Sequence, residues 1–144
     1  MKVELIIKKD IIEPYAIIYS NELTDEVSNV INKIKNNSTK LSASLKDKIY
    51  ILKPKEIYLI KVLEGKLEVY DKSKQYIMNK RLYEVKEILT NNFIQISKGT
   101  IINVDYVESV EVSFSGTLKV KLKNELQDYI SRSYVKKFKE YLEL

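Results

Sequence analysis

Residues 93–112 read FIQISKGTIINVDYVESVEV, and this stretch predicts the frame on which the rest of the chain is organised. Its first part, up to Ile96, has the pattern of a strand, and a polar break follows at Ser97-Lys98-Gly99. A second apolar run begins at Thr100, and apolar residues alternate again from Val107. The pattern therefore predicts a loop with an exposed lysine between two buried strands. Binding residues commonly lie on loops that a rigid frame holds in place.

The composition excludes several classes of function. Of the 144 residues, 44% are hydrophobic and 31% are charged, which is typical of a folded domain with or without a small appendage. The chain contains no cysteine and no histidine. Disulfides, thiolate metal sites and catalysis by Ser-His or Cys-His pairs are therefore impossible. No catalytic constellation and no dense run of carboxylates is visible, so we expect neither an enzyme nor a bound metal or cofactor.

The net charge of +5 is compatible with a polyanionic partner, and the excess of basic residues lies entirely after residue 40. Lysine-rich compositions of this kind also occur in proteins that bind no nucleic acid. No apolar run approaches the roughly 20 residues that span a bilayer, so no membrane insertion is expected. The N-terminus has acidic residues within its apolar stretch and no small-residue cleavage site, which argues against a signal peptide and favours a cytoplasmic location.

Residues 1–40 predict an N-terminal unit made of a β-hairpin and a helix. Residues 2–9 and 15–19 alternate like two strands, and Thr24 is a candidate N-cap. The helix that follows would have one apolar stripe, formed by Leu23, Val27, Val30, Ile31 and Ile34. Residues 36–39 are polar and read as a linker. Because a unit of this size is too small to be secure alone, we expect it either to complete the core or to form a homodimer.

Residues 41–144 predict a mainly β domain with minor α, that is, an α+β fold built of antiparallel hairpins. Turn signals separate the short apolar runs at 46–48, 63–66, 71–74, 115–116 and 124–125. Helical periodicity appears in residues 80–89 and 131–144. Strands do not alternate with long helices, so a Rossmann-type sheet is not expected.

Three segments of this second part occur in the order found in a known family. They are PKEIYLIKVLEGKLEVY (54–70), RLYEVKEILTNNFIQISKGTIINVDYVESVE (81–111) and LKVKLKNELQDYISRSYVKKFKEYL (118–142). Over residues 45–144 this order resembles the LytTR DNA-binding domain. The chain length and the N-terminal unit resemble the stand-alone members of that family, which lack a receiver domain and are often paired with a small membrane protein.

The resemblance implies small antiparallel sheets whose loops, rather than a recognition helix, enter successive major grooves of double-stranded DNA. Two copies would read paired sites in a promoter region, which implies a homodimeric transcriptional regulator. The three reading loops would be Glu64-Gly65-Lys66, Ser97-Lys98-Gly99 and Arg132-Ser133. The candidate DNA-binding residues are Lys66, Ser97, Lys98, Arg132, Ser133 and Lys136. Lysine and arginine can donate to guanine O6 and N7, and lysines around the loops would neutralise phosphates.

Some positions depart from the family pattern. Arginine is usual where Gln95 stands, histidine where Ser97 stands and serine where Gly99 stands, and a basic residue is common at the position of Ser133. An alternative function is therefore a LytTR-like protein-interaction module that has lost base-specific DNA reading.

The basic candidates also have ordinary structural readings. Lys98 is compatible with a solvated loop lysine, and Arg132 with an ion pair to Asp128 or Glu125. The alternating lysines of residues 119–123 are compatible with the protection of a strand edge.

Overall fold

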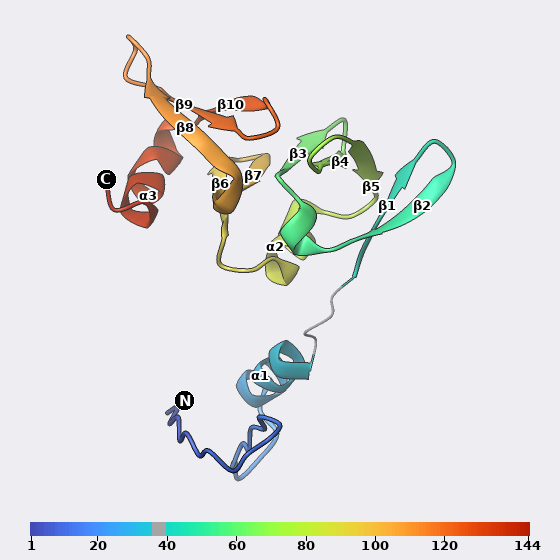
Figure 1. The fold of residues 1–144 in the computed structure, drawn as a ribbon, viewed down its shortest axis with the longest axis vertical. Helices are drawn as coiled ribbons and strands as arrows, with labels where there is room; N and C mark the ends of the chain where they lie inside the picture. The colour runs from blue at the N-terminus through green and yellow to red at the C-terminus, as the bar shows by residue number, and fades with distance from the viewer. Residues whose placement is uncertain (36–39) are drawn as a thin grey trace. The chain divides into compact units, whose positions relative to one another are not determined.

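The computed structural model describes residues 1–35 and 40–144 and divides the chain into two compact units, Met1–Ser38 and Thr39–Leu144 (Figure 1). We call them the N-terminal unit and the C-terminal unit. Residues 36–39, which the sequence suggests as a linker, lie outside the described residues. Within the described ranges, every strand belongs to the C-terminal unit.

The N-terminal unit contains the predicted helix, α1 (Asp25–Lys35). Thr24 caps it, because its Oγ1 accepts a hydrogen bond of 3.3 Å from the N–H of Val27. The acidic residues Asp25 and Glu26 stand in the first turn, where the helix dipole favours negative charge. These local features explain why the helix begins where it does.

The predicted hairpin in front of this helix is wrong, since none of residues 1–19 forms a strand. Val3, Leu5 and Ile7, which the alternation assigns to one buried face, are 83–85% exposed. Alternation identifies the side chains that would share a face, but a strand also needs a partner backbone and a surface that covers that face. The stripe of α1 is likewise only partly covered, because Ile34 is 51% exposed.

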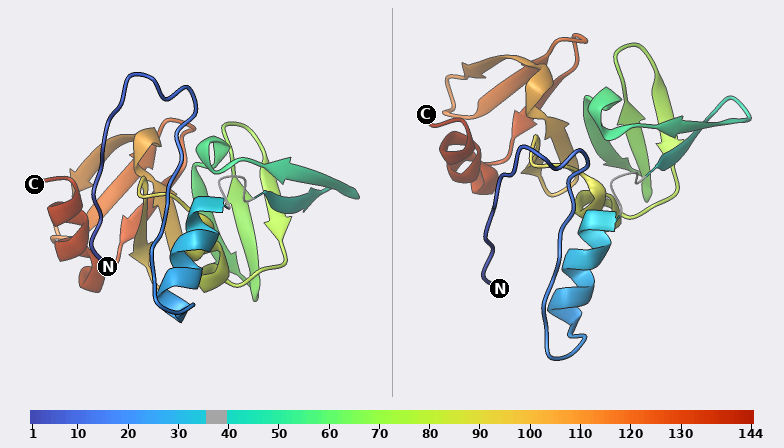
Figure 2. Two further views of the ribbon diagram at one scale, coloured as in Figure 1. Left: turned by 90° about the horizontal axis from the view of Figure 1, so that it is seen from below. Right: turned by 60° about the horizontal axis from the view of Figure 1, so that its bottom comes forward.

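Seven antiparallel strands form the large sheet of the C-terminal unit, in the spatial order β2-β1-β5-β4-β3-β7-β6. They are β1 (Leu41–Leu45), β2 (Lys48–Leu52), β3 (Leu59–Leu63), β4 (Lys66–Tyr70), β5 (Gln75–Met78), β6 (Phe93–Ser97) and β7 (Thr100–Asn103). A 3-10 turn, η1 (Pro54–Glu56), leads into β3, and α2 (Leu82–Ile88) connects β5 to β6. The hairpin of β1 and β2 projects from this sheet (Figure 2).

Three further strands form a small antiparallel sheet in the order β10-β9-β8. They are β8 (Val107–Val112), β9 (Leu118–Leu122) and β10 (Gln127–Ile130), and a 3-10 turn, η2 (Val104–Tyr106), joins β7 to β8. The chain then forms α3 (Arg132–Tyr141). This helix and the β1–β2 hairpin lie at opposite ends of the C-terminal unit (Figures 1 and 2). The predicted mainly β, α+β fold of antiparallel hairpins is confirmed.

Two hydrophobic clusters hold the C-terminal unit together. The first contains Ile60 of β3 and Val85 of α2, and the second contains Leu59 of β3 and Phe138 of α3. Neighbouring residues of β3 therefore contribute to different clusters, because successive side chains of a strand point to opposite faces. Burial on both faces explains why this part of the chain is a continuous apolar run rather than an alternating one.

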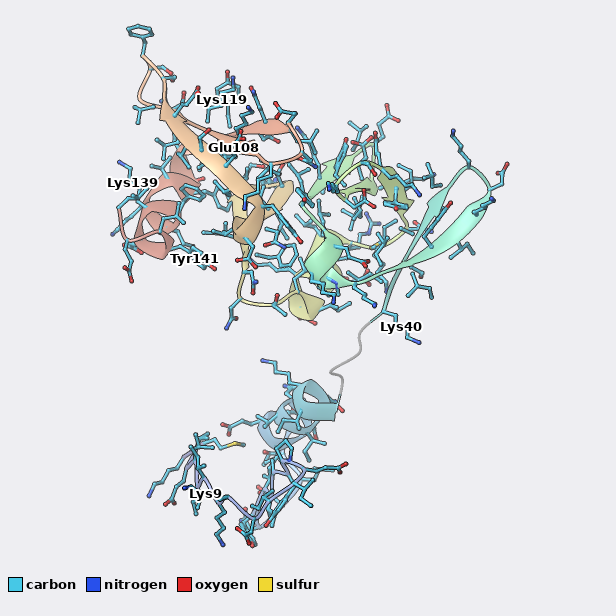
Figure 3. All side chains as sticks on the ribbon, viewed as in Figure 1. Lys9, Lys40, Glu108, Lys119, Lys139 and Tyr141 are labelled. Atoms are coloured by element: carbon cyan, nitrogen blue, oxygen red, sulfur yellow. The ribbon has the colours of Figure 1, made fainter. Side chains whose placement is uncertain are left out.

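The side chain of Tyr141 fastens α3 to the connection between α2 and β6 (Figure 3). Its hydroxyl donates a hydrogen bond of 2.6 Å to the carbonyl oxygen of Asn91. Together with the burial of Phe138, this bond fixes α3 beside β6. Because Tyr141 is the last residue of α3, the bond anchors the C-terminal end of the helix beside the start of β6.

Candidate nucleic-acid interface

The loop between β6 and β7 is held by its own polar side chains. The Oγ of Ser97 accepts a hydrogen bond of 3.3 Å from the N–H of Gly99, and Nε2 of Gln95 donates one of 3.2 Å to the carbonyl oxygen of Lys98. The side chain of Lys98 is exposed. The loop therefore has a fixed backbone and presents its lysine to the solvent.

The turn between β3 and β4 lies next to this loop. The N–H of Val62, near the end of β3, donates a hydrogen bond of 2.8 Å to the carbonyl oxygen of Gly99. Glu64 and Gly65 then form a two-residue turn with φ angles of 49° and 77°. Such turns need positive φ at both residues, which glycine adopts without strain. Lys66 follows at the start of β4 and is exposed.

The start of α3 lies on the other side of the same loop. The N–H of Ser131 donates a hydrogen bond of 2.8 Å to the carbonyl oxygen of Ile96, the residue just before Ser97. Arg132 begins the helix one residue later. The three segments that the sequence proposes as reading loops are therefore neighbours. We call Glu64-Gly65-Lys66, Ser97-Lys98-Gly99 and Arg132-Ser133 together the loop face.

The candidate DNA-binding side chains on the first turns of α3 are available to a ligand. Arg132, Ser133 and Lys136 are exposed on the first turns of α3. The two carboxylates suggested as partners of Arg132 are bound elsewhere: Asp128 lies 3.0 Å from Lys61, and Glu125 lies 3.2 Å from Lys121. Between residues 40 and 144, no ion pair joins Arg132 to either of them. The DNA contacts assigned to these side chains stay predictions.

A second group of basic residues adjoins the loop face and was not found from the sequence. A hollow of about 410 Å³ is lined by Gly65 and Lys98 together with residues around the start of α2: Lys80, Arg81, Leu82, Tyr83 and Lys86. The Nζ of Lys86 donates a hydrogen bond of 2.9 Å to Oε1 of Gln95. The adjacent residues Lys80 and Arg81 form a basic pair that is visible in the sequence, but only the folded chain brings this pair to the β6–β7 loop.

The lysines of β9 are partly engaged by neighbouring groups. Lys121 lies 2.9 Å from Glu108 and 3.2 Å from Glu125, and these two hydrogen-bonded carboxylates raise the pKa of the lysine. Lys119 has its Nζ 5.9 Å from the ring centre of Tyr129. Figure 3 shows Glu108 and Lys119 on the small sheet. The face of β9 that carries these lysines is therefore a mixed charged surface rather than a purely basic one.

Neither a metal site nor a membrane-spanning helix is seen in the described ranges. Within residues 1–35 and 40–144, no group of three acidic side chains is arranged to hold a metal ion. None of the helices described there has both the length and the apolar character that crossing a bilayer requires.

The C-terminal unit is a mainly β domain whose neighbouring loops carry exposed basic residues. The family model of the LytTr DNA-binding domain matches residues 47–143. The chain belongs to the LytTR DNA-binding domain family, which is a family of DNA-binding regulators and not of enzymes. The resemblance proposed from the sequence is confirmed.

Comparison with known proteins agrees with this membership. An uncharacterized HTH-type transcriptional regulator of Staphylococcus aureus strain NCTC 8325 is 28% identical over 146 residues, covering 100% of this chain and 99% of the relative. The corresponding protein of strain MRSA252 is 27% identical with the same coverage. A solved LytTr DNA-binding domain from Bacillus cereus superposes with a TM-score of 0.70 at 16% identity, covering 75% of this chain and all of that domain. The solved domain supports the fold.

Proposed function

We propose that this chain is a transcriptional regulator that binds double-stranded DNA with sequence specificity. In this proposal the loop face enters the major groove, where base pairs present distinct patterns of donors and acceptors. Lys66, Lys98 and Arg132 donate to bases or to the phosphates beside them. Ser133 and Lys136 add contacts along the first turns of α3.

The observation that carries this proposal is the contact between the three loops. Two backbone hydrogen bonds, from Val62 to Gly99 and from Ser131 to Ile96, join segments that are far apart in the sequence. Each bond joins the backbone of one loop segment to the end of a strand, so the basic side chains of the loops start from a defined arrangement. A preorganised set of contacts loses less entropy on binding than a mobile one.

The regulator is further proposed to act as a homodimer on paired sites. The exposed apolar side chains of the N-terminal unit, such as Val3 and Leu5, are candidates for the contact between copies or for contact with a small membrane protein. Sedimentation of the full chain, alone and with a duplex carrying two sites, measures this directly. If the chain sediments as a monomer alone and binds the two-site duplex as a monomer, the proposed homodimer is contradicted.

A second candidate function is a protein-interaction module without base reading. It is favoured by the internal hydrogen bonds of Gln95 and Ser97, which engage the two side chains at positions where the family usually has basic residues. In that case a partner protein, rather than DNA, would contact the loop face.

Footprinting on the upstream region of the gene for this protein separates the two candidates. The samples are the wild type, Lys98→Ala and the control Lys46→Ala, which removes an exposed lysine from the distant β1–β2 turn. We expect Lys98→Ala to weaken specific binding by about 1–3 kcal/mol, the value of one good base contact. We expect the control to bind like the wild type.

Protection at a defined site that disappears in Lys98→Ala supports the regulator. If the wild type protects no site and binds all duplexes equally, base reading is excluded and the interaction module is favoured.

A further inference from the structure

We propose that the hollow between α2 and the loop face is a phosphate-binding groove for the backbone of the same DNA duplex. We call it the α2 groove and define it by Lys80, Arg81, Tyr83 and Lys86 together with Lys98. The inference rests on the proposed function and extends it to Lys80, Arg81, Tyr83 and Lys86, which have no place among the loop contacts. Its occupant is the sugar-phosphate backbone beside the bases that the loops read.

The charge of the groove is of one sign. Every charged side chain that lines it is basic, namely Lys80, Arg81, Lys86 and Lys98. Within residues 1–35 and 40–144, none of the ion pairs involves any of these four. Four like charges around one hollow repel each other, and a polyanion that enters it relieves the repulsion.

The acidic side chain of Glu84, which follows the groove residue Tyr83 on α2, is hydrogen-bonded to the backbone. Oε2 of Glu84 accepts a hydrogen bond of 2.8 Å from the N–H of Arg81, so this carboxylate caps the start of the helix. The partner of Lys86 is the neutral amide of Gln95, which orients the lysine without cancelling its charge. Lys86 therefore keeps its positive charge at the groove even though its side chain is held in place.

The position of the groove identifies its occupant. It shares Lys98 and Gly65 with the loop face, so a duplex that contacts the loops passes over it. Tyr83 is 68% exposed at the groove and carries a hydroxyl that can donate to a phosphate oxygen. Contacts of this kind fix the orientation of a protein on the duplex without reading its sequence.

The experiment compares the salt dependence of binding for three forms of the full chain. They are the wild type, the double variant Lys80→Ala/Arg81→Ala, and the matched control Lys46→Ala/Lys48→Ala. Both doubles remove two exposed lysine or arginine charges, and the control does so at the far hairpin. Each form is titrated with its upstream duplex and with an unrelated duplex of equal length, over a range of salt concentrations.

We expect Lys80→Ala/Arg81→Ala to weaken binding to both duplexes by a similar factor. The slope of log K against log salt should fall by about 0.9 for each phosphate that the variant no longer neutralises, hence by nearly 2. The ratio of specific to unspecific affinity should stay close to that of the wild type. The variant Arg81→Lys, which keeps the charge, should keep the slope.

The proposal is overturned if the wild type binds DNA but the double variant has the same slope as the control. It is equally overturned if the double variant loses only the preference for the upstream duplex, because the residues would then read bases. Failure of the proposed function looks different: the wild type itself then shows no preference between the duplexes. Thermal unfolding of each form shows whether a variant is folded.

Discussion

The Nζ of Lys61 lies 3.0 Å from Oδ2 of Asp128, and this ion pair joins the large sheet to the small sheet. Lys61 belongs to β3, which ends at the turn of Glu64 and Gly65. Asp128 belongs to β10, which leads into α3 and Arg132. The pair therefore spans two of the three segments of the loop face and helps to set the distance between them.

A double-mutant cycle of Lys61→Met and Asp128→Asn tests this pair. The lysine side chain is 45% exposed and that of the aspartate 19%, so solvent screens much of the attraction. We expect a coupling energy of about 0.2–1 kcal/mol in urea unfolding, and a smaller one at high salt. A coupling energy of zero at low salt would show that the two charges contribute nothing to the contact between the sheets.

Gly65→Ala should destabilise the C-terminal unit by about 1–2 kcal/mol, because the new Cβ is strained in the left-handed region. The φ of Gly65 is 77°, whereas Gly99 is not among the glycines with positive φ. A Cβ added at Gly99 would meet no atom closer than 3.4 Å, the Cβ of Val62. Gly99→Ala is therefore the matched control, and we expect it to cost clearly less. Urea midpoints measure both, and equal losses would contradict the role of the φ angle.

Phe138→Ala should lower the free energy of unfolding by about 3–5 kcal/mol, since it empties space in the second hydrophobic cluster. Phe138 is 0% exposed and packs in that cluster with Ile96 and Ile130. Phe114→Ala removes the same atoms from the tip of the β8–β9 hairpin, where the side chain is fully exposed. Thermal unfolding should separate the two variants widely; a similar loss for both would contradict the assigned core.

Asp71 should make part of the free energy of unfolding depend on pH in the acidic range. Burial alone would raise the pKa of this carboxyl, but hydrogen bonds from the N–H groups of Ser73 and Lys74 and from the hydroxyl of Tyr76 lower the pKa below its ordinary value of 3.8. A carboxyl with a lower pKa in the folded state stabilises the protein above its unfolded pKa. This stability is lost as the pH falls below 3.8 and through the folded value.

The variant Asp71→Asn isolates that contribution. It should be less stable than the wild type at pH 7, and the difference should shrink as the pH falls below 3.8, because the carboxyl of the unfolded wild-type chain then takes up a proton before that of the folded chain does. Urea unfolding at pH 7 and below pH 3.8 measures the difference. A difference that does not change with pH would show that the charge of Asp71 is not the source of the stability.

The sequence by itself determined the local structure of the C-terminal unit. Apolar alternation predicted the strands, and glycine and polar turn residues predicted where they reverse, because side-chain direction and φ preference are local properties. The motif around Ser97-Lys98-Gly99 also indicated the family, which the comparisons confirm. The same local reasoning was wrong in residues 2–19, because alternation in Val3 and Leu5 says nothing about whether a partner strand exists.

Only the tertiary structure decided which loops are neighbours. The pairing of β3 with β7, and the bond from Ser131 to Ile96, join residues tens of positions apart, and nothing in either local sequence specifies its partner. The α2 groove arises in the same way, since Arg81 and Lys98 come from distant parts of the sequence and line the same hollow only in the folded chain. Long-range contacts depend on how the whole set of apolar faces is buried at once, and this is a property of the complete fold.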